Sequence, residues 1–226
     1  MAGMEEFREA VTAWAAEGAA GAVTGGAPRG AGGDTAEGPA GDIAAEWAAR
    51  AAVRTVVLVE GPSDVAAVGA LAAARGRDLE GEGVCVLAMG GAMSIARFAQ
   101  LLGPPGLDLR LTGLCDEAER GFYERGFARA GAARQRFFVC AADLEDELIR
   151  ALGVPRVTEL VRAEGDLRAL RTFLQQPAQR DRAAPRQLRR FIGTKKGRKI
   201  RYGHVLVRAL PPDLVPPPLD DLLNSL

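Results

Sequence analysis

The sequence predicts an α/β protein with a mostly parallel central sheet and helices on both of its faces. Apolar runs at residues 56–60, 83–89, 109–116 and 136–140 are typical of buried strands, and helical segments of about a dozen residues separate them. Such connections form right-handed crossovers, which place the strands parallel in one sheet. With 226 residues and 48% hydrophobic content, the chain is long enough for one main core with appendages.

Residues 1–52 are predicted to precede this core as a separate segment. Residues 7–18 have the pattern of a short amphipathic helix, and residues 18–41 are rich in Gly and Ala with few large apolar side chains, which indicates a flexible linker. No Gly-Lys-Ser/Thr follows these glycines, so the segment is not an ATP-binding phosphate loop. Asp42 is expected to cap a helix over residues 43–52 that leads into the first strand.

The core is predicted to span residues 53–150, with the last 76 residues, 151–226, forming a helical basic extension that ends in a Pro-rich tail. The stretch PPDLVPPPLDDLL is expected to end the sheet and to dock a short amphipathic helix. Core helices are expected over residues 64–76, 93–103, 117–130 and 143–153.

Acidic side chains follow three of the predicted strands. Glu60 ends the first, with Ser63 expected to cap the next helix and Asp64 in its first turn. Asp116 ends the third strand, and Asp143 and other acids follow the fourth. Parallel strands bring their carboxyl ends to one edge of a sheet, where these acids would repel each other unless a cation lay between them. Oxygen ligands favour Mg²⁺ or Mn²⁺. The alternative to a metal site is that Asp64 only interacts favourably with the dipole of the helix and that Glu60 is a solvated residue at the end of the strand.

The formal net charge of zero conceals a strong asymmetry. Between Arg180 and Arg208 there are 11 Lys and Arg residues and a single acid, Asp181. A solvated helical face is one interpretation of this segment, but phosphate binding fits the imbalance better. The only lysines of the chain lie here, in GTKKGRK, although arginine is common elsewhere. A compact ammonium can sit beside a phosphate where the planar guanidinium is too bulky.

The cysteine pattern and the first residues indicate a cytoplasmic protein without a membrane segment. Cys85, Cys115 and Cys140 are odd in number, lack CxxC spacing and lie in or beside apolar runs, so we expect buried reduced thiols. The start, MAGMEEFREAV, carries acid where a signal peptide would carry base, and no apolar run reaches membrane-spanning length.

Several of these stretches together resemble a known domain. VLVEGPSD, VCVLAMGGA with IARF, and LTGLCDEAE are similar to the TOPRIM domain of topoisomerases, primases and the overcoming lysogenization defect (OLD) nucleases. ADLEDELI and GTKKGRKIRYGHVLVRAL make the OLD-type TOPRIM the nearest resemblance within that group. The resemblance implies a Rossmann-like TOPRIM fold and a nucleotidyl transferase/hydrolase that cuts nucleic acid with Mg²⁺ or Mn²⁺.

The same resemblance implies roles for the acids. Glu60 matches the motif glutamate, Asp64 the acid that follows it, and Asp116 the first Asp of the family's DxD motif. The second Asp of that motif falls on Ala118, so Glu119 or Glu117 must substitute, or a metal ligand is missing. Asp143 and Glu145 match the later elements of the family's metal shell.

Lys199, with Lys196 as the alternative, matches the family lysine that approaches the scissile phosphate. The resemblance thus implies a Mg²⁺- or Mn²⁺-dependent nuclease in which Glu60 and Lys199 are catalytic, and DNA is favoured over RNA as its partner. Two alternatives stay open at this point: a non-catalytic binding or scaffold module, and a nuclease subunit that works with a separate ATPase. Assembly as a homodimer also stays open.

Overall fold

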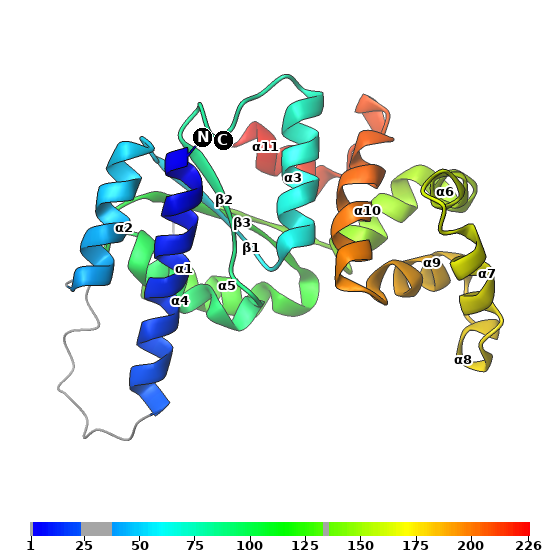
Figure 1. Cartoon of the computed structure of the whole chain (residues 1–226), viewed down its shortest axis with the longest axis horizontal. Coiled ribbons are helices and arrows are strands. Elements are labelled where there is room, and N and C mark those ends of the chain that lie inside the picture. The colour runs from blue at the N-terminus through cyan, green and yellow to red at the C-terminus, as the bar shows by residue number, and fades with distance from the viewer. Residues whose placement is uncertain (1, 24–37, 133–135) are drawn as a thin grey trace.

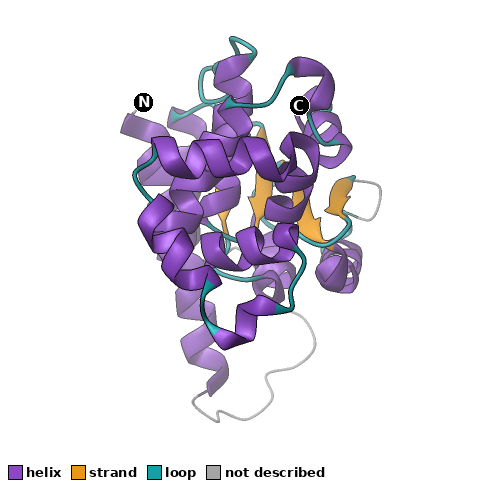
Figure 2. Ribbon diagram, turned by 90° about the vertical axis from the view of Figure 1, so that its right-hand side faces the viewer, coloured by secondary structure: helices purple, strands orange, loops and turns teal. Residues whose placement is uncertain are grey.

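The computed structural model describes residues 2–23, 38–132 and 136–226, and over these ranges it shows one sheet of four parallel strands between layers of helices (Figure 1). The strand order is β2-β1-β3-β4. The strands are β1 Thr55–Val59, β2 Val84–Ala88, β3 Arg110–Asp116 and β4 Phe137–Cys140. The predicted α/β class and parallel sheet are confirmed, and Figure 2 shows the strands side by side, surrounded by helices.

Alternate side chains of the strands enter two separate cores, because successive residues of a strand point to opposite faces. Val57 and Val59 pack on one face with helices α3, α6, α10 and α11, and Val56 and Leu58 pack on the other with α1, α2, α4 and α5. The first group of helices spans Pro62–Ala74, Leu144–Ala163, Lys196–Arg208 and Pro217–Asn224; the second spans Ala2–Val23, Pro39–Arg50, Ile95–Leu102 and Arg120–Arg129.

The N-terminal helices are longer than the sequence predicted. Helix α1 continues to Val23 instead of ending at residue 18, and α2 begins at Pro39 instead of after Asp42. Alanine is the strongest helix former and proline is favoured at the first helical position, so both ends extend into the Gly/Ala-rich stretch. The central part of the predicted linker, residues 24–37, lies outside the described residues.

The predicted C-terminal extension contributes to the main core. Tyr202 and Leu206 of α10 and Leu222 of α11 are fully buried together with the side chains of β1. Helix α6 crosses the predicted boundary at residue 150 and kinks at Gly153, whose φ of 77° is a conformation that glycine adopts readily. Three further helices, α7 Leu167–Leu174, α8 Pro177–Arg180 and α9 Ala184–Gly193, connect α6 to α10.

Two predictions about side chains and membrane character can be compared with the structure. Cys85, Cys115 and Cys140 are buried and unpaired, as expected for reduced thiols. Across the described ranges, no helix combines the length and the apolar character needed to cross a membrane.

Candidate metal centre

The register of the sheet places Glu60 beside the end of β3. Val59 pairs with Leu114, so the chain leaves β1 at Glu60 next to the last residues of β3, where Asp116 ends the strand. The amides of Gly90 and Gly91 donate to the Glu60 carbonyl at 3.0 and 3.2 Å, and both glycines have positive φ. The turn after β2 therefore fixes the backbone of Glu60 at the carboxyl edge of the sheet.

A 3₁₀ turn, η2 Glu117–Glu119, brings a third carboxylate to this edge. Residues three apart lie on the same side of a 3₁₀ helix, so Glu119 lies above Asp116. Carboxylate oxygens of Glu60, Asp116 and Glu119 all lie within 4.8 Å of one another, and we call these three residues the acidic cluster. Glu117 instead pairs with Arg120 at 2.9 Å, and 53% of its side chain is exposed. Of the two substitutes that the sequence offered for the missing acid at Ala118, only Glu119 joins the cluster.

Asp64 caps the start of α3, which corrects the prediction for Ser63. The N-cap residue is Gly61, Pro62 takes the first helical position, and the Gly61 amide donates to Asp64 Oδ2 at 2.9 Å. An acid at the third helical position can reach back to the N-cap amide, and proline is pre-shaped for the first turn, so the helix begins two residues earlier than predicted. Asp64 also lines the small cavity at the acidic cluster, into which Glu145 and Lys199 extend.

Asp143 and Glu145, at the start of α6, reach the same edge but lie beside basic side chains. Asp143 is the N-cap of α6: its Oδ1 accepts the Asp146 amide at 2.8 Å, and its Oδ2 accepts Arg189 Nε at 2.5 Å. Glu145 is buried, with 5% of its side chain exposed, and its Oε2 lies 3.4 Å from Lys199 Nζ. Arg189 was not predicted from the sequence, because it lies 46 residues from Asp143 along the chain and no local pattern links the two.

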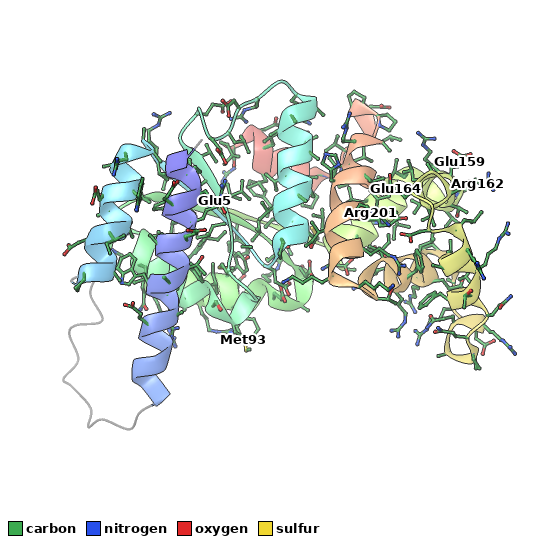
Figure 3. The ribbon with its side chains drawn as sticks, viewed as in Figure 1. Glu5, Met93, Glu159, Arg162, Glu164 and Arg201 are labelled. Atoms are coloured by element: carbon green, nitrogen blue, oxygen red, sulfur yellow. The ribbon has the colours of Figure 1, made fainter. Side chains whose placement is uncertain are left out.

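Helix α10 holds Lys199 in this position through a close contact with α3. A Cβ atom at Gly203 would lie 2.5 Å from the Ser63 carbonyl oxygen, so only glycine permits this approach of the two helices. Arg201 pairs with Glu164 at 3.5 Å and with Asp166, which fixes α10 against the end of α6 (Figure 3). Lys199, one turn before Gly203, therefore faces the acids, whereas Lys196 is exposed to solvent.

Burial and mutual repulsion shift Asp116, Glu119 and Glu145 toward their protonated forms. Burial, then the charges of Asp143 and Glu119, raises the pKa of Asp116 to about 8. Burial, then Glu60, raises the pKa of Glu119 to about 7, and Glu119 Oε2 is buried without a hydrogen-bond partner in the described structure. Burial also raises the pKa of Glu145 to about 7, although Lys199 opposes the shift. Crowded carboxylates with an unpartnered oxygen fit a divalent cation with oxygen ligands.

These shifts predict that a metal ion stabilises the protein more at pH 8 than at pH 5. Because the folded-state pKa values of Asp116 and Glu119 are raised, the folded protein binds more protons than the unfolded chain, and metal-free stability falls as pH rises from about 4 to 8. A divalent ion at 100 times its Kd adds about 2.7 kcal/mol, which is roughly 5–11 °C in Tm, and protons compete with it at low pH. Thermal melts with and without Mn²⁺ at both pH values measure this; equal stabilisation at the two pH values would contradict it.

A basic cavity of about 400 Å³ adjoins these acids. Its lining combines Asp143, Glu145 and Lys199 with arginines of α9 and of the turn before it. Arg182, Arg186 and Arg190 are exposed and line this cavity, and we call them the arginine stripe. Arg186 and Arg190 are four residues apart on one side of α9, and Arg182 lies in the turn before the helix. The acids at the sheet edge and the basic segment predicted from charge asymmetry thus lie next to each other in space.

Comparison with known proteins agrees with this geometry. Residues 53–117 match the model of the overcoming lysogenization defect protein-like TOPRIM domain. Over this range the chain is similar to an OLD-like TOPRIM domain. The matched range includes Glu60, Asp64 and Asp116 and ends before Glu119. The resemblance drawn from the sequence motifs is therefore confirmed.

Solved structures resemble the chain over a longer range than the family match. The C-terminal region of the Burkholderia pseudomallei OLD protein superposes with a TM-score of 0.59 at 21% identity, covering 76% of this chain and 96% of that one. The C-terminal region of the Xanthomonas campestris pv. campestris OLD protein, phased with platinum, has a TM-score of 0.60 at 25% identity, covering 76% and 91%. A search of curated proteins found no significant match.

Proposed function

We propose that the protein is a Mg²⁺- or Mn²⁺-dependent nuclease that acts on phosphodiester bonds of nucleic acid, with DNA favoured over RNA. The observation that carries the proposal is the meeting of an acidic cluster and a basic cavity at the carboxyl edge of an OLD-like TOPRIM sheet. In open α/β sheets this edge is where ligands bind. Acids alone would repel a phosphate, and arginines alone would bind it without chemistry.

In this proposal the acidic residues bind the metal ion and the basic residues bind the phosphates. Glu60, Asp116 and Glu119 would hold the metal ion, with Asp64 beside them. A bound divalent ion supplies Lewis-acid polarisation of the phosphoryl oxygens and stabilises charge on the attacking and leaving oxygens.

Lys199 lies between this metal centre and the arginines, where its ammonium can neutralise charge that develops on the phosphoryl group. Glu60 is in place to accept or deliver a proton as well as to bind metal. Arg189 and the arginine stripe would hold the phosphates that flank the scissile one.

The direct test is cleavage of single-stranded, duplex and supercoiled DNA, and of RNA, by the purified full chain over a Mn²⁺ titration. We expect cleavage that is absent in EDTA and returns with Mn²⁺. Lack of cleavage on every substrate would contradict the nuclease proposal and favour a TOPRIM module that only binds nucleic acid.

The departure at Ala118 is the observation that supports this second candidate, because it removes one acid of the DxD motif. A separate ATPase partner, a homodimer and a cytoplasmic location stay predictions from the sequence.

The arginine stripe gives a prediction for binding. Replacing Arg182, Arg186 and Arg190 by Gln is expected to reduce the slope of log K against log salt by about 0.7 to 0.9 for each phosphate that is no longer neutralised, hence by about 2 to 3 in all. The side chains are exposed, so the fold should be unaffected. Deleting the segment is a poorer test, since α10 and α11 form part of the main core.

The matched control removes three arginines from the neighbouring surface. Arg162, Arg168 and Arg171 of α6 and α7 are exposed and lie outside the lining of the basic cavity. Their replacement by Gln lowers the net charge equally and is expected to leave most of the salt slope in place. Equal reductions of the slope in the two triple variants would mean that nonspecific charge, not the stripe, accounts for binding.

A further inference from the structure

We infer that the chain holds a single divalent ion, in the acidic cluster, and that the side chains of Arg189 and Lys199 occupy the position of a second cation. The inference rests on the proposed function and specifies its metal content. It concerns the six acids that the sequence predicts as metal ligands, among them Glu119 as the substitute for the missing second Asp of the motif. These acids fall into two sets that differ in how their charge is balanced.

In the described structure, the first set has no basic partner at ion-pair distance. Burial raises the pKa of Asp64, and the charge of Lys199, which lines the same small cavity, opposes that shift. Among the ion pairs of the described residues, none involves Glu60, Asp64, Asp116 or Glu119. Three of these carboxylates converge within 4.8 Å, and the buried Glu119 Oε2 has no hydrogen-bond partner in the described structure. When they are ionised, these carboxylates carry negative charge that no ion pair balances, and a divalent ion would neutralise it.

The second set is already neutralised by the protein. Asp143 accepts a hydrogen bond from Arg189 at 2.5 Å, and Glu145 lies 3.4 Å from Lys199. Both acids are largely inaccessible, with 14% and 5% of their side chains exposed. Two negative and two positive charges leave no net attraction for a second divalent ion, and its entry would leave two cations without partners.

The sequence supplies no further acid for a second ion. Ala118 stands where the family motif has its second Asp, and the nearest substitute, Glu119, already belongs to the acidic cluster through the 3₁₀ turn. Glu117, the other neighbouring acid, pairs with Arg120 on the exposed side. The absence of one acid and the presence of Arg189 beside Asp143 thus both disfavour the binding of a second metal ion.

This arrangement keeps two positive centres near the scissile phosphate, one a metal ion and one made of side chains. Arg189 donates through Nε to Asp143 and also lines the basic cavity, so its remaining N–H donors are available to phosphoryl oxygens. A guanidinium matches two phosphate oxygens at once, which suits it to orient the group. We assign Arg189 as a positioning residue that links the acidic cluster to the arginine stripe.

The test counts metal ions on the full-length protein without substrate. Isothermal titration with Mn²⁺, checked by the electron paramagnetic resonance signal of free Mn²⁺, is expected to give one ion per wild-type chain. Two ions per chain would overturn the inference and leave the nuclease proposal intact. No bound ion would overturn both the metal site and the inference, whereas one ion without any cleavage would leave the inference standing and contradict the nuclease.

Paired substitutions test whether Arg189 and Lys199 are the reason why the chain binds one metal ion and not two. The double variant Arg189→Gln with Lys199→Gln frees both acids and is expected to bind two Mn²⁺ ions. The control, Arg186→Gln with Lys196→Gln, removes two nearby positive charges that pair with neither acid and is expected to bind one. A double variant that still binds one ion would overturn the assignment of Arg189 and Lys199 to the second position. If either variant fails to fold, the wild-type count still decides the number of ions.

Discussion

Asp116→Asn is expected to lower Mn²⁺-dependent cleavage by about a thousandfold, which corresponds to about 4 kcal/mol of transition-state stabilisation. The amide keeps the size of the side chain but removes a charge from the acidic cluster, where Asp116 lies within 4.8 Å of Glu60 and Glu119. Nucleic-acid affinity is expected to hold or to tighten, because one charge that repels phosphate is gone. Cleavage and binding are measured separately over a Mn²⁺ titration.

Glu117→Gln is the matched control for this variant. Glu117 is the next residue along the chain and carries the same charge, but it pairs with Arg120 on the exposed side of the 3₁₀ turn. We expect its cleavage rate to stay within about twofold of wild type, since an exposed i,i+3 ion pair contributes little. If both variants lose cleavage equally, the loss would be caused by the change of charge near the site and not by the loss of a metal ligand. If Asp116→Asn cuts as well as wild type, the metal centre does not carry the chemistry.

The strands and their order of appearance could be predicted because buried parallel strands have a strong local signal. Val56 to Val59 are consecutive aliphatic residues, three of them β-branched, and such a short run is typical of a strand covered on both faces. The structure confirms this, with Val57 and Leu58 fully buried on opposite faces of the sheet.

Helix ends were harder to predict because several residues compete for the same capping position. Ser63 has the side chain of a good N-cap, yet Pro62 starts the helix earlier and Asp64 takes the capping bond to Gly61. At the C-terminal end of α1, the Ala-rich residues up to Val23 extend the helix where the glycines indicated a linker. At both helix ends, residue preferences of similar free energy favour different end positions, so small differences in free energy decide where the helix begins or ends.

The positions of the acids followed from topology, but their partners did not. Parallel strands necessarily bring Glu60 and Asp116 to one edge, so their meeting could be predicted without coordinates. The choice of Glu119 over Glu117 depends on whether the chain after β3 forms a 3₁₀ turn or a regular helix, which the sequence does not specify. The Arg189 pair with Asp143 depends on how α9 packs against α6, a contact between segments far apart in the chain.

Lys199→Arg is expected to lower kcat by about a hundredfold while leaving nucleic-acid affinity nearly unchanged. Lys199 lies in the space between Glu145 and the acidic cluster, where the cavity is narrow. A guanidinium keeps the charge there but is planar and longer, so it cannot place one donor at the point where the ammonium sits. A loss of kcat without a loss of affinity would show that the ammonium acts on the reacting phosphate and not only on binding.

Lys196→Arg provides the comparison, and it also tests the alternative lysine from the sequence. Lys196 lies one turn earlier on α10 and is exposed, with room for a guanidinium, so kcat and affinity are expected to stay within about twofold of wild type. The opposite pattern, with Lys196→Arg inactive and Lys199→Arg active, would assign the catalytic role to Lys196 and would mean that α10 moves when nucleic acid binds. Activity in both variants would show that charge alone is sufficient at this position, because either basic group could then neutralise the phosphate.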